Sequence, residues 1–245
     1  MGLLIRRPHS AGELLDLALA VTKRHFWSLF RLGALPLAIA VLLDFLLRVV
    51  GAGQEWELLA ILPVFVCMGI AESRMIVAAW QLLHEQPIDP ISAQKQVWLR
   101  LVPVVLGYSV KWTLALLGIF LLIVPGVMVL LWWFAVPTVT VIERRGFWSS
   151  MRRSRDLARG QKKRLLGTLG VFDLAVIVLS VGFTMLYGDS ATGELPLWAD
   201  ATTWAVTLLL FPFRATLMAA VYTDIRVRLE GYDLEAEASQ LAGVA

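Results

Sequence analysis

Five ionisable residues lie inside otherwise apolar stretches of the sequence: Glu72, Arg74, Lys111, Asp173 and Arg214. An ionisable side chain in a membrane interior costs at least about 2.5 kcal/mol, so such groups normally face the inside of a helix bundle and pair there. Counting along the expected helices places four of them roughly 12–17 Å from one end, with Glu72 about one residue deeper. The five residues are therefore expected to form one buried charged layer.

The chemistry of this layer depends on how its members pair. We expect Asp173 to face Arg214, and Glu72 to face Lys111 or Arg74. Two interpretations stay open at this point. The layer is either a substrate or ion site, or a set of neutralised pairs that fixes the register of the helices.

A dense basic segment separates two apolar runs and contains Arg144, Arg145, Arg152, Arg153, Arg155, Arg159, Lys162, Lys163 and Arg164. In a helix, Phe147, Met151, Ser154 and Ala158 share one face, and the arginines project around it. Such a helix on the inner leaflet attracts anionic phospholipid with about 1 kcal/mol per basic residue. The alternative is that this charge only sets the topology. Nucleic acid is not an expected partner, because every basic residue here lies within a short loop of a membrane.

Signals for an enzyme are missing from the sequence. His84-Glu85 is followed by Gln86-Pro87-Ile88, so the second histidine of a zinc-protease motif is absent. No nucleophile elbow, phosphate-binding loop or dinucleotide fingerprint follows an expected strand. The single cysteine, Cys67, excludes an intramolecular disulfide and a cysteine-based metal cluster. We predict no catalytic residue, no metal site and no cofactor.

The elements that position these charges are apolar helices. Hydrophobic residues make up 58% of the chain and charged residues 17%, against about 45–50% and about 25% in soluble domains. A span needs about 20 residues. The runs predict an all-α polytopic membrane protein with six transmembrane helices in three hairpins, at about 29–50, 58–83, 98–120, 126–142, 165–187 and 197–222. Residues 84–97 are expected to form a polar loop, and 223–245 a cytoplasmic C-terminal tail.

The first 28 residues predict an N-terminal cytoplasmic or interfacial amphipathic helix. Ser10 and Glu13 fit the capping box that begins a helix. Leu14 and Ala18 fall on the apolar side, and ordinary packing against the bundle is an equally open alternative. In the span that follows, Pro36 is a candidate for a kink. Near the outer end of the span, Asp44 and Arg48 are spaced to pair with each other.

Charge asymmetry orients the spans. Placing both chain ends and the long connections on one side puts all basic residues there except Arg48, Arg74, Lys111 and Arg214, that is 18 of 22. The charged residues of the loops on the opposite side are all acidic: Glu55, Glu57, Asp189, Glu194 and Asp200. The positive-inside rule then predicts a cytoplasmic (inner) membrane protein with both termini in the cytoplasm.

Two stretches carry a pattern found in a known family. The first contains Pro137, Glu143, Arg153, Ser154, Leu157 and Gly160, and the second Tyr222, Asp224, Arg226, Arg228, Glu230, Gly231 and Asp233, with Pro212 upstream. In these residues the chain resembles the bacterial membrane family called the glycerophosphoryl diester phosphodiesterase membrane domain. The family takes its name from proteins that fuse this region to a catalytic α/β barrel. Since only 13 residues follow Tyr232, that activity is not carried over to this chain.

The resemblance directs attention to an inner-face clasp made of Glu143, Asp224, Arg226, Arg228 and Glu230. We expect the residues after Tyr222 to form ion pairs with the segment 143–159. The leading functional hypothesis is a non-catalytic scaffold or accessory subunit that contacts anionic lipid at the cytoplasmic face, with a membrane or cytoplasmic protein as a further partner. The alternatives are a transporter or export component that uses the charged layer and, third, a membrane enzyme of lipid phosphodiester metabolism.

Overall fold

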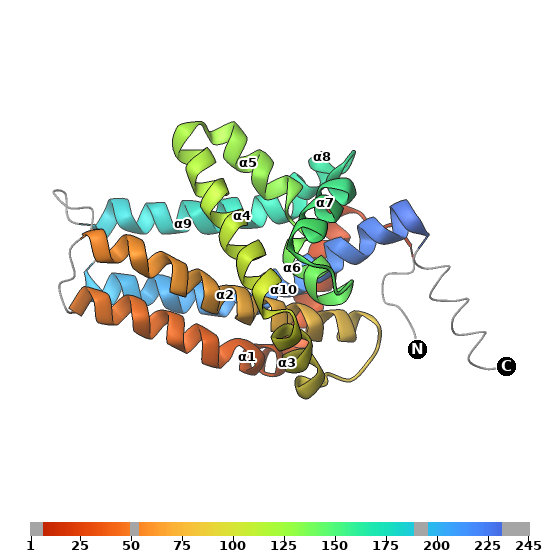
Figure 1. Ribbon diagram of the computed structural model, residues 1–245, viewed down its shortest axis with the longest axis horizontal. Coiled ribbons are helices and arrows are strands. Elements are labelled where there is room, and N and C mark those ends of the chain that lie inside the picture. Colours follow the sequence, from red (N-terminus) through yellow and green to blue (C-terminus); the bar gives the residue numbers. More distant parts are fainter. Residues whose placement is uncertain (1–6, 50–53, 189–195, 232–245) are drawn as a thin grey trace.

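The computed structural model describes residues 7–49, 54–188 and 196–231, and in these ranges the chain forms helices and no strand (Figure 1). In order they are α1 (Ala11–Val49), α2 (Gln54–Leu83), α3 (Pro90–Leu99), α4 (Leu101–Leu121), α5 (Ile123–Trp132), α6 (Val136–Ile142), α7 (Phe147–Ala158), α8 (Lys162–Leu165), the π-helical turn η1 (Leu166–Gly170), α9 (Val171–Tyr187) and α10 (Leu197–Glu230). Six segments are long and apolar enough to cross a membrane. The expectation of an all-helical chain with six such segments is confirmed for the described residues.

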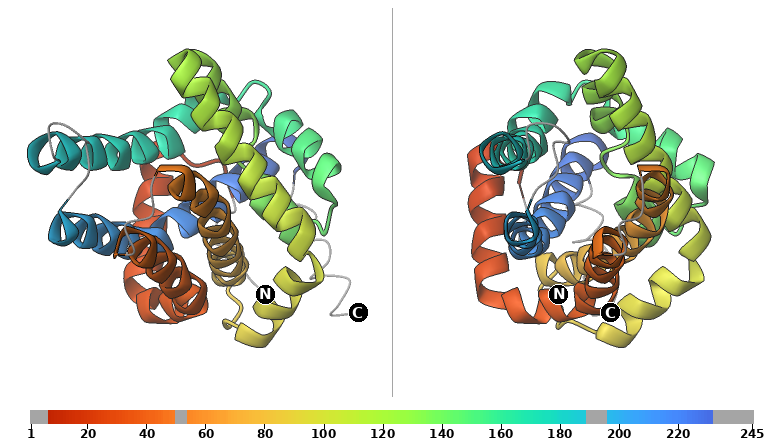
Figure 2. Two further views of the ribbon diagram at one scale, coloured as in Figure 1. Left: turned by 60° about the vertical axis from the view of Figure 1, so that its left-hand side comes forward. Right: turned by 90° about the vertical axis from the view of Figure 1, so that its left-hand side faces the viewer.

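α1 begins with the predicted capping box and then changes direction. The Ser10 amide donates to Glu13 Oε2 at 2.6 Å, and the Glu13 amide donates to Ser10 Oγ at 3.2 Å. The helix is interrupted at His25, with φ −121° and ψ 21°, ahead of the predicted span that contains Pro36. Before the break, Leu14 and Ala18 are fully buried in the core. The first part of α1 therefore packs against the bundle, where α1 contacts α10, and Figure 2 shows the red helix α1 changing direction.

A short helix occupies part of the connection that was expected to be a polar loop. α3 begins after Asp89, whose side chain accepts hydrogen bonds from the amides of Ile91 and Ser92. Pro90 takes the first helical position, where its missing amide costs nothing. Ala93 and Val97 are buried. The Asp-Pro signal was therefore present in the sequence, and the two prolines of the connection obscured it.

The predicted span at 126–142 is two helices, α5 and α6, separated by a break at residues 133–135. A break inside an apolar region leaves backbone groups without helical partners. Ser154 of α7 satisfies two of them, because its hydroxyl accepts from the Ala135 amide and donates to the Trp132 carbonyl, both at 3.0 Å. A buried serine of the basic segment thus satisfies the backbone groups at a break in the neighbouring apolar segment.

Two glycines allow α4 and α5 to approach each other closely. A Cβ on Gly118 would lie 2.7 Å from the Gly126 nitrogen, and a Cβ on Gly126 would lie 2.7 Å from the Ala115 carbonyl oxygen. Backbones at this separation are typical of membrane helices with small residues at the contact. α5 begins at Ile123, so Pro125 lies in its first turn.

α10 is longer than the predicted span. It continues past Tyr222 to Glu230 and ends at Gly231, which adopts the left-handed conformation with φ 61°. Glycine favours this conformation because it has no Cβ, and it is the usual residue there after a helix. Residues 223–230, which were expected to belong to the tail, are therefore helical.

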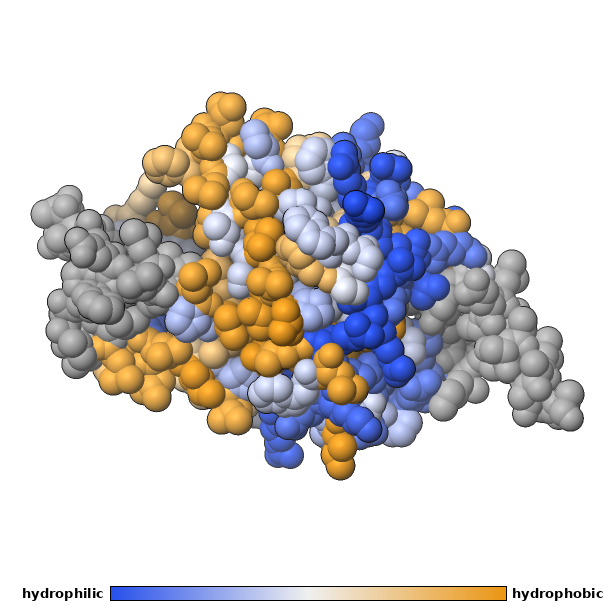
Figure 3. All heavy atoms as spheres, in the orientation of Figure 1, coloured by the Kyte–Doolittle hydropathy of each residue, from blue (hydrophilic) through white to orange (hydrophobic). Residues whose placement is uncertain are grey.

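Hydrophilic and hydrophobic residues separate along the length of the molecule. Hydrophilic side chains form a band over the end that carries α7, and apolar side chains cover the visible face to its left (Figure 3). We call this end, which carries the arginines and lysines of residues 144–164, the basic end. Other predicted positions lie outside the described residues or side chains: Arg6, Arg48, Glu55, Glu57, Asp189, Glu194 and Asp233. Asp44, the expected partner of Arg48, accepts a hydrogen bond from Trp204 Nε1 at 3.0 Å.

Candidate functional site

Arg214 lies at the centre of the charged layer, between two carboxylates. Its Nε donates to Asp173 Oδ1 at 2.9 Å, and its Nη1 donates to Glu72 Oε1. The expected pair of Asp173 with Arg214 is present. Glu72 also pairs with Arg214, and not with Lys111 or Arg74, because α2 packs against α10 and one guanidinium fork can serve two acids. Glu72 is only 1% exposed.

Lys111 of α4 lies near this pair without an ion pair or hydrogen bond to any described residue. It is 1% exposed. Its Nζ is 5.4 Å from the ring centre of Tyr108 and 5.2 Å from that of Trp112. Aromatic faces attract a cation by about 1–2 kcal/mol when both are desolvated. The layer contains two basic residues, Lys111 and Arg214, and two acidic residues, Glu72 and Asp173, so its net charge is zero.

Arg74 does not take part in this layer. No described carboxylate forms an ion pair with it, and its Nε is buried without a hydrogen bond to the described residues. It lies two residues after Glu72 on α2, and residues at that spacing project from different faces of a helix. Arg74 therefore pairs with neither acid of the layer.

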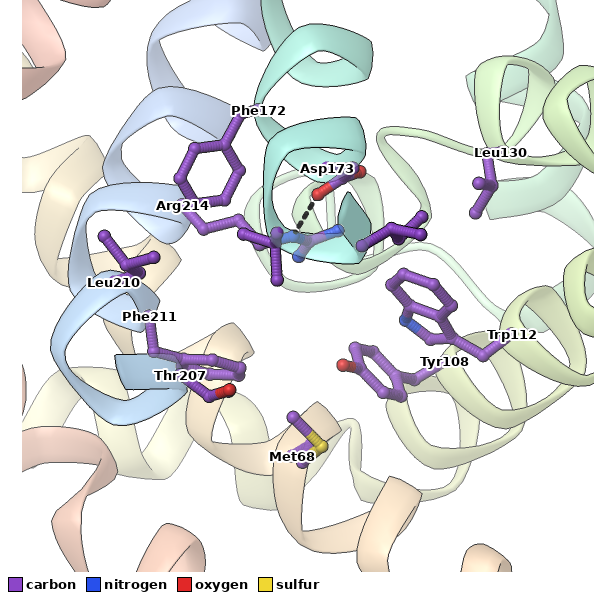
Figure 4. Close-up of a pocket in the computed structure, with 12 residues that line it drawn as sticks. Met68, Tyr108, Trp112, Leu130, Phe172, Asp173, Thr207, Leu210, Phe211 and Arg214 are labelled. Carbon is purple, nitrogen blue, oxygen red and sulfur yellow. Dashed lines mark hydrogen bonds and ion pairs between the residues drawn. The ribbon is translucent and has the colours of Figure 1, made fainter. Parts of the chain in front are cut away.

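Two apolar cavities flank the Asp173–Arg214 pair. The first, of about 140 Å³, is lined by side chains of α2, α4, α5, α9 and α10 (Figure 4). The second, of about 160 Å³, extends toward η1 and has Lys111 in its wall. Leu130, Asp173, Ile177 and Arg214 line both cavities. The charged layer therefore borders two cavities whose walls are mainly apolar.

At the basic end, the first half of the clasp centres on Glu143. Its carboxylate accepts from Arg145 Nε at 2.6 Å, from Arg153 Nε at 3.0 Å and from the Tyr222 hydroxyl at 2.8 Å. Burial opposes the ionisation of Glu143, but the bonds from Tyr222 and Arg153 outweigh it and hold the pKa of this carboxyl below its ordinary value. Arg153 also pairs with Glu230 of α10.

The second half of the clasp centres on Asp224, which is fully buried. Its Oδ2 lies 2.7 Å from Arg164 Nη2 and 2.9 Å from Arg228 Nε, and its Oδ1 accepts from the His9 amide at 2.7 Å. The cluster of Asp224 and Glu230 was expected to pair with the segment 143–159. Glu230 does so through Arg153, whereas Asp224 pairs with Arg164, beyond that segment. The added turns of α10 place Asp224 beside Arg164 at the start of the next span.

The clasp residues contributed by the end of α10 thus divide into two sets. Glu230 reaches α7 and is bridged within α10 by Arg226 at 2.8 Å. Arg228 bonds to Asp224 and also donates to the His9 carbonyl at 2.6 Å. The start of α1, the end of α6, α7, α8 and α10 are therefore held together at one end of the bundle.

The apolar face of α7 packs inside the protein and does not lie on a leaflet. Met151, Leu157 and Ala158 are buried, and α7 contacts α4, α5 and α6. Ser150 is also buried and accepts from Thr140 Oγ1 at 3.0 Å. The amphipathic pattern was read correctly, but sequence alone does not distinguish a lipid surface from a protein surface as its partner.

Three of the predicted lipid-binding cations, Arg145, Arg153 and Arg164, contribute to the clasp. Of these three, Arg145 is itself exposed. The six cations outside the clasp are all exposed: Arg144, Arg152, Arg155, Arg159, Lys162 and Lys163. We call these six the exposed cation set. Arg155 and Lys162 lie over the Trp132 ring, at 5.1 and 5.6 Å from its centre, and Arg159 has an exposed partner at 3.3 Å, Asp156.

Sequence reasoning missed several residues that shape both sites. It did not predict the hydrogen bonds of Ser154, the cations over the Trp132 ring, or the hydrogen bonds of the His9 backbone. A signal existed for Ser154, because an uncharged hydroxyl on the apolar face of a basic helix requires a buried partner. The role of His9 depends on the fold alone, since 215 residues separate it from Asp224.

Comparison with known proteins finds no matching family model, no matching curated protein and no matching solved structure. The resemblance to the phosphodiesterase membrane domain therefore stays a prediction.

Proposed function

We propose that this chain is a non-catalytic multi-pass membrane module whose cytoplasmic face binds anionic phospholipid, as a scaffold or accessory subunit. The observation that carries this proposal is the division of the basic segment. The clasp neutralises Arg145, Arg153 and Arg164 with internal acids, while the exposed cation set remains on the surface beside them. Cations held on a fixed surface lose less conformational freedom when they meet a charged head group than flexible ones do.

The supporting physical argument is electrostatic. Each basic residue near an anionic leaflet gains about 1 kcal/mol, and the attraction falls off within about 8 Å at physiological ionic strength. Arg144, Arg152 and Lys163 form no ion pair or hydrogen bond with a described residue. They are therefore the cations most available to phosphate groups.

The test replaces these three residues together by glutamine and measures lipid selectivity in bilayer nanodiscs. Spin-labelled phosphatidylglycerol and phosphatidylcholine report the relative association constant at the protein surface. We expect wild type to favour phosphatidylglycerol, and the triple variant to lose at least about fivefold of that preference. Fivefold corresponds to about 1 kcal/mol in total, which is less than the sum of about 1 kcal/mol for each of the three residues. Raised salt should reduce the wild-type preference in the same direction.

The matched control carries Lys23→Gln, Arg24→Gln and Lys95→Gln. These residues are also exposed and lie in α1 and α3, so the change in net charge is the same. The control should keep most of the selectivity. Equal losses in both variants would show that only total charge matters, and would contradict a dedicated surface at α7 and α8.

A further inference from the structure

The charged layer contains a buried cation that the clasp and the exposed cation set do not explain. Lys111 is 1% exposed, and its ammonium lies over the faces of Tyr108 and Trp112. No described carboxylate lies within ion-pair distance of its ammonium. A buried ammonium normally has a carboxylate or other oxyanion partner. The two acids of the layer are both bonded to Arg214.

The wall of the second cavity carries a positive excess. Lys111 and Arg214 face it with one acid, Asp173, whereas Glu72 lines neither cavity. An oxyanion in this cavity would contact Lys111 directly, while the charge of Glu72 is held behind Arg214. Because Coulomb energy falls with distance, the attraction between the oxyanion and Lys111 exceeds the repulsion between the oxyanion and the more distant Glu72.

The rest of the cavity surface is apolar, and its size limits the ligand. An engineered apolar cavity of about 150 Å³ holds one benzene molecule. Each of the two cavities, at about 140 and 160 Å³, therefore accepts roughly the same number of carbon atoms. Ile177 lines both cavities, so the two cavities are adjacent on the side of α9.

The cavities are reached from the side of the bundle along α9. No residue of α9 is buried, and the helix packs mainly on α10 and η1. Ile177 lines both cavities and is 43% exposed. We call the space between α9 and the α4–α5 pair the lateral groove, since residues of both sides line the second cavity. A π-helical turn, η1, also contributes Leu166 and Leu169 to its wall, and such turns are frequent at functional sites.

We propose that the lateral groove binds one single-chain anionic amphiphile, with its oxyanion head on Lys111 and its alkyl chain in the two cavities beside Arg214. The head group is a carboxylate or a phosphate, and the two share the same recognition by an ammonium. This site lies within the membrane segments and is separate from the lipid surface at α7 and α8. A failure of one proposal therefore leaves the other standing.

The test uses the full chain in nanodiscs with palmitate that carries a diazirine on its chain. Illumination should label peptides of α4, α9 and α10 that line the groove, and unlabelled palmitate or lysophosphatidate should compete. The chain-matched alcohol, hexadecanol, should compete at least about tenfold less well, because it offers no charge to Lys111. Competition by only one of the two anions shows whether the site prefers a carboxylate or a phosphate head group.

Two variants and one control complete the design. Lys111→Met removes the ammonium and should weaken palmitate labelling at least about tenfold. Ile177→Trp should block the groove while keeping every charge, so it tests the site even if Lys111→Met does not fold. Val178→Trp is the matched control, because Val178 is 61% exposed and lines neither cavity. Equal competition by hexadecanol and palmitate, or unchanged labelling in Ile177→Trp, would overturn the proposal.

Discussion

Replacing Asp224 by asparagine should destabilise the fold strongly, because this carboxylate has no access to water. It is 0% exposed and bonds to Arg164 at 2.7 Å, to Arg228 at 2.9 Å and to the His9 amide at 2.7 Å. Removing one partner of a buried ion pair costs about 3–5 kcal/mol. Asparagine keeps the volume and one acceptor, so we expect about 3 kcal/mol, the low end of that range. The measurement is reversible unfolding in mixed micelles, followed by circular dichroism.

A double-mutant cycle isolates the pair with Arg164. We expect Arg164→Gln to cost at least about 1 kcal/mol less in the Asp224→Asn background than in wild type, since the partner is already lost. Arg159 and Asp156 form the control pair, at 3.3 Å with side chains 73% and 55% exposed, and their coupling should stay below about 0.5 kcal/mol. Additive costs for Asp224 and Arg164 would refute the second half of the clasp.

Three further predictions follow from the contacts. Ser154→Ala should cost about 1–3 kcal/mol in the same unfolding assay, because two backbone groups lose their partner, whereas Ser149→Ala, at an exposed site, should change little. The pKa of Glu143 is lowered in the folded state, so its stabilisation is present above its unfolded pKa of about 4.3 and is lost as pH falls through the folded value. Melting curves of Glu143→Gln should therefore be less sensitive to acid than those of wild type, and equal slopes would contradict this. Arg214→Gln should destabilise by about 3–5 kcal/mol, since two acids lose their cation; a fully folded variant of unchanged melting temperature would contradict it.

Helix content and the matching positions of charges along different helices could be predicted from sequence because both depend on local counts. The apolar runs gave the six membrane-length segments, and residue counting along them brought Asp173 and Arg214 to matching positions. Ser10 and Glu13 gave the helix start in full, since a capping box closes within one turn. These features need no information about distant parts of the chain.

Partner choice could not be predicted in the same way. Glu72 was assigned to Lys111 or Arg74, but the rotation of each helix about its axis decides which side chains meet, and tertiary packing sets that rotation. Asp224 pairs with Arg164, beyond the expected segment 143–159, and the length of α10 was underestimated. A polar segment after a span fits a tail or a longer helix equally well until its ion pairs are known.

The proposed lipid surface is tested most directly by native mass spectrometry of the protein extracted with its surrounding membrane. Wild type should retain anionic phospholipid that the variant Arg144→Gln, Arg152→Gln, Lys163→Gln loses, while the control Lys23→Gln, Arg24→Gln, Lys95→Gln keeps it. Identical retained lipid in all three proteins would contradict the account, and would leave the exposed cation set with the role of setting topology.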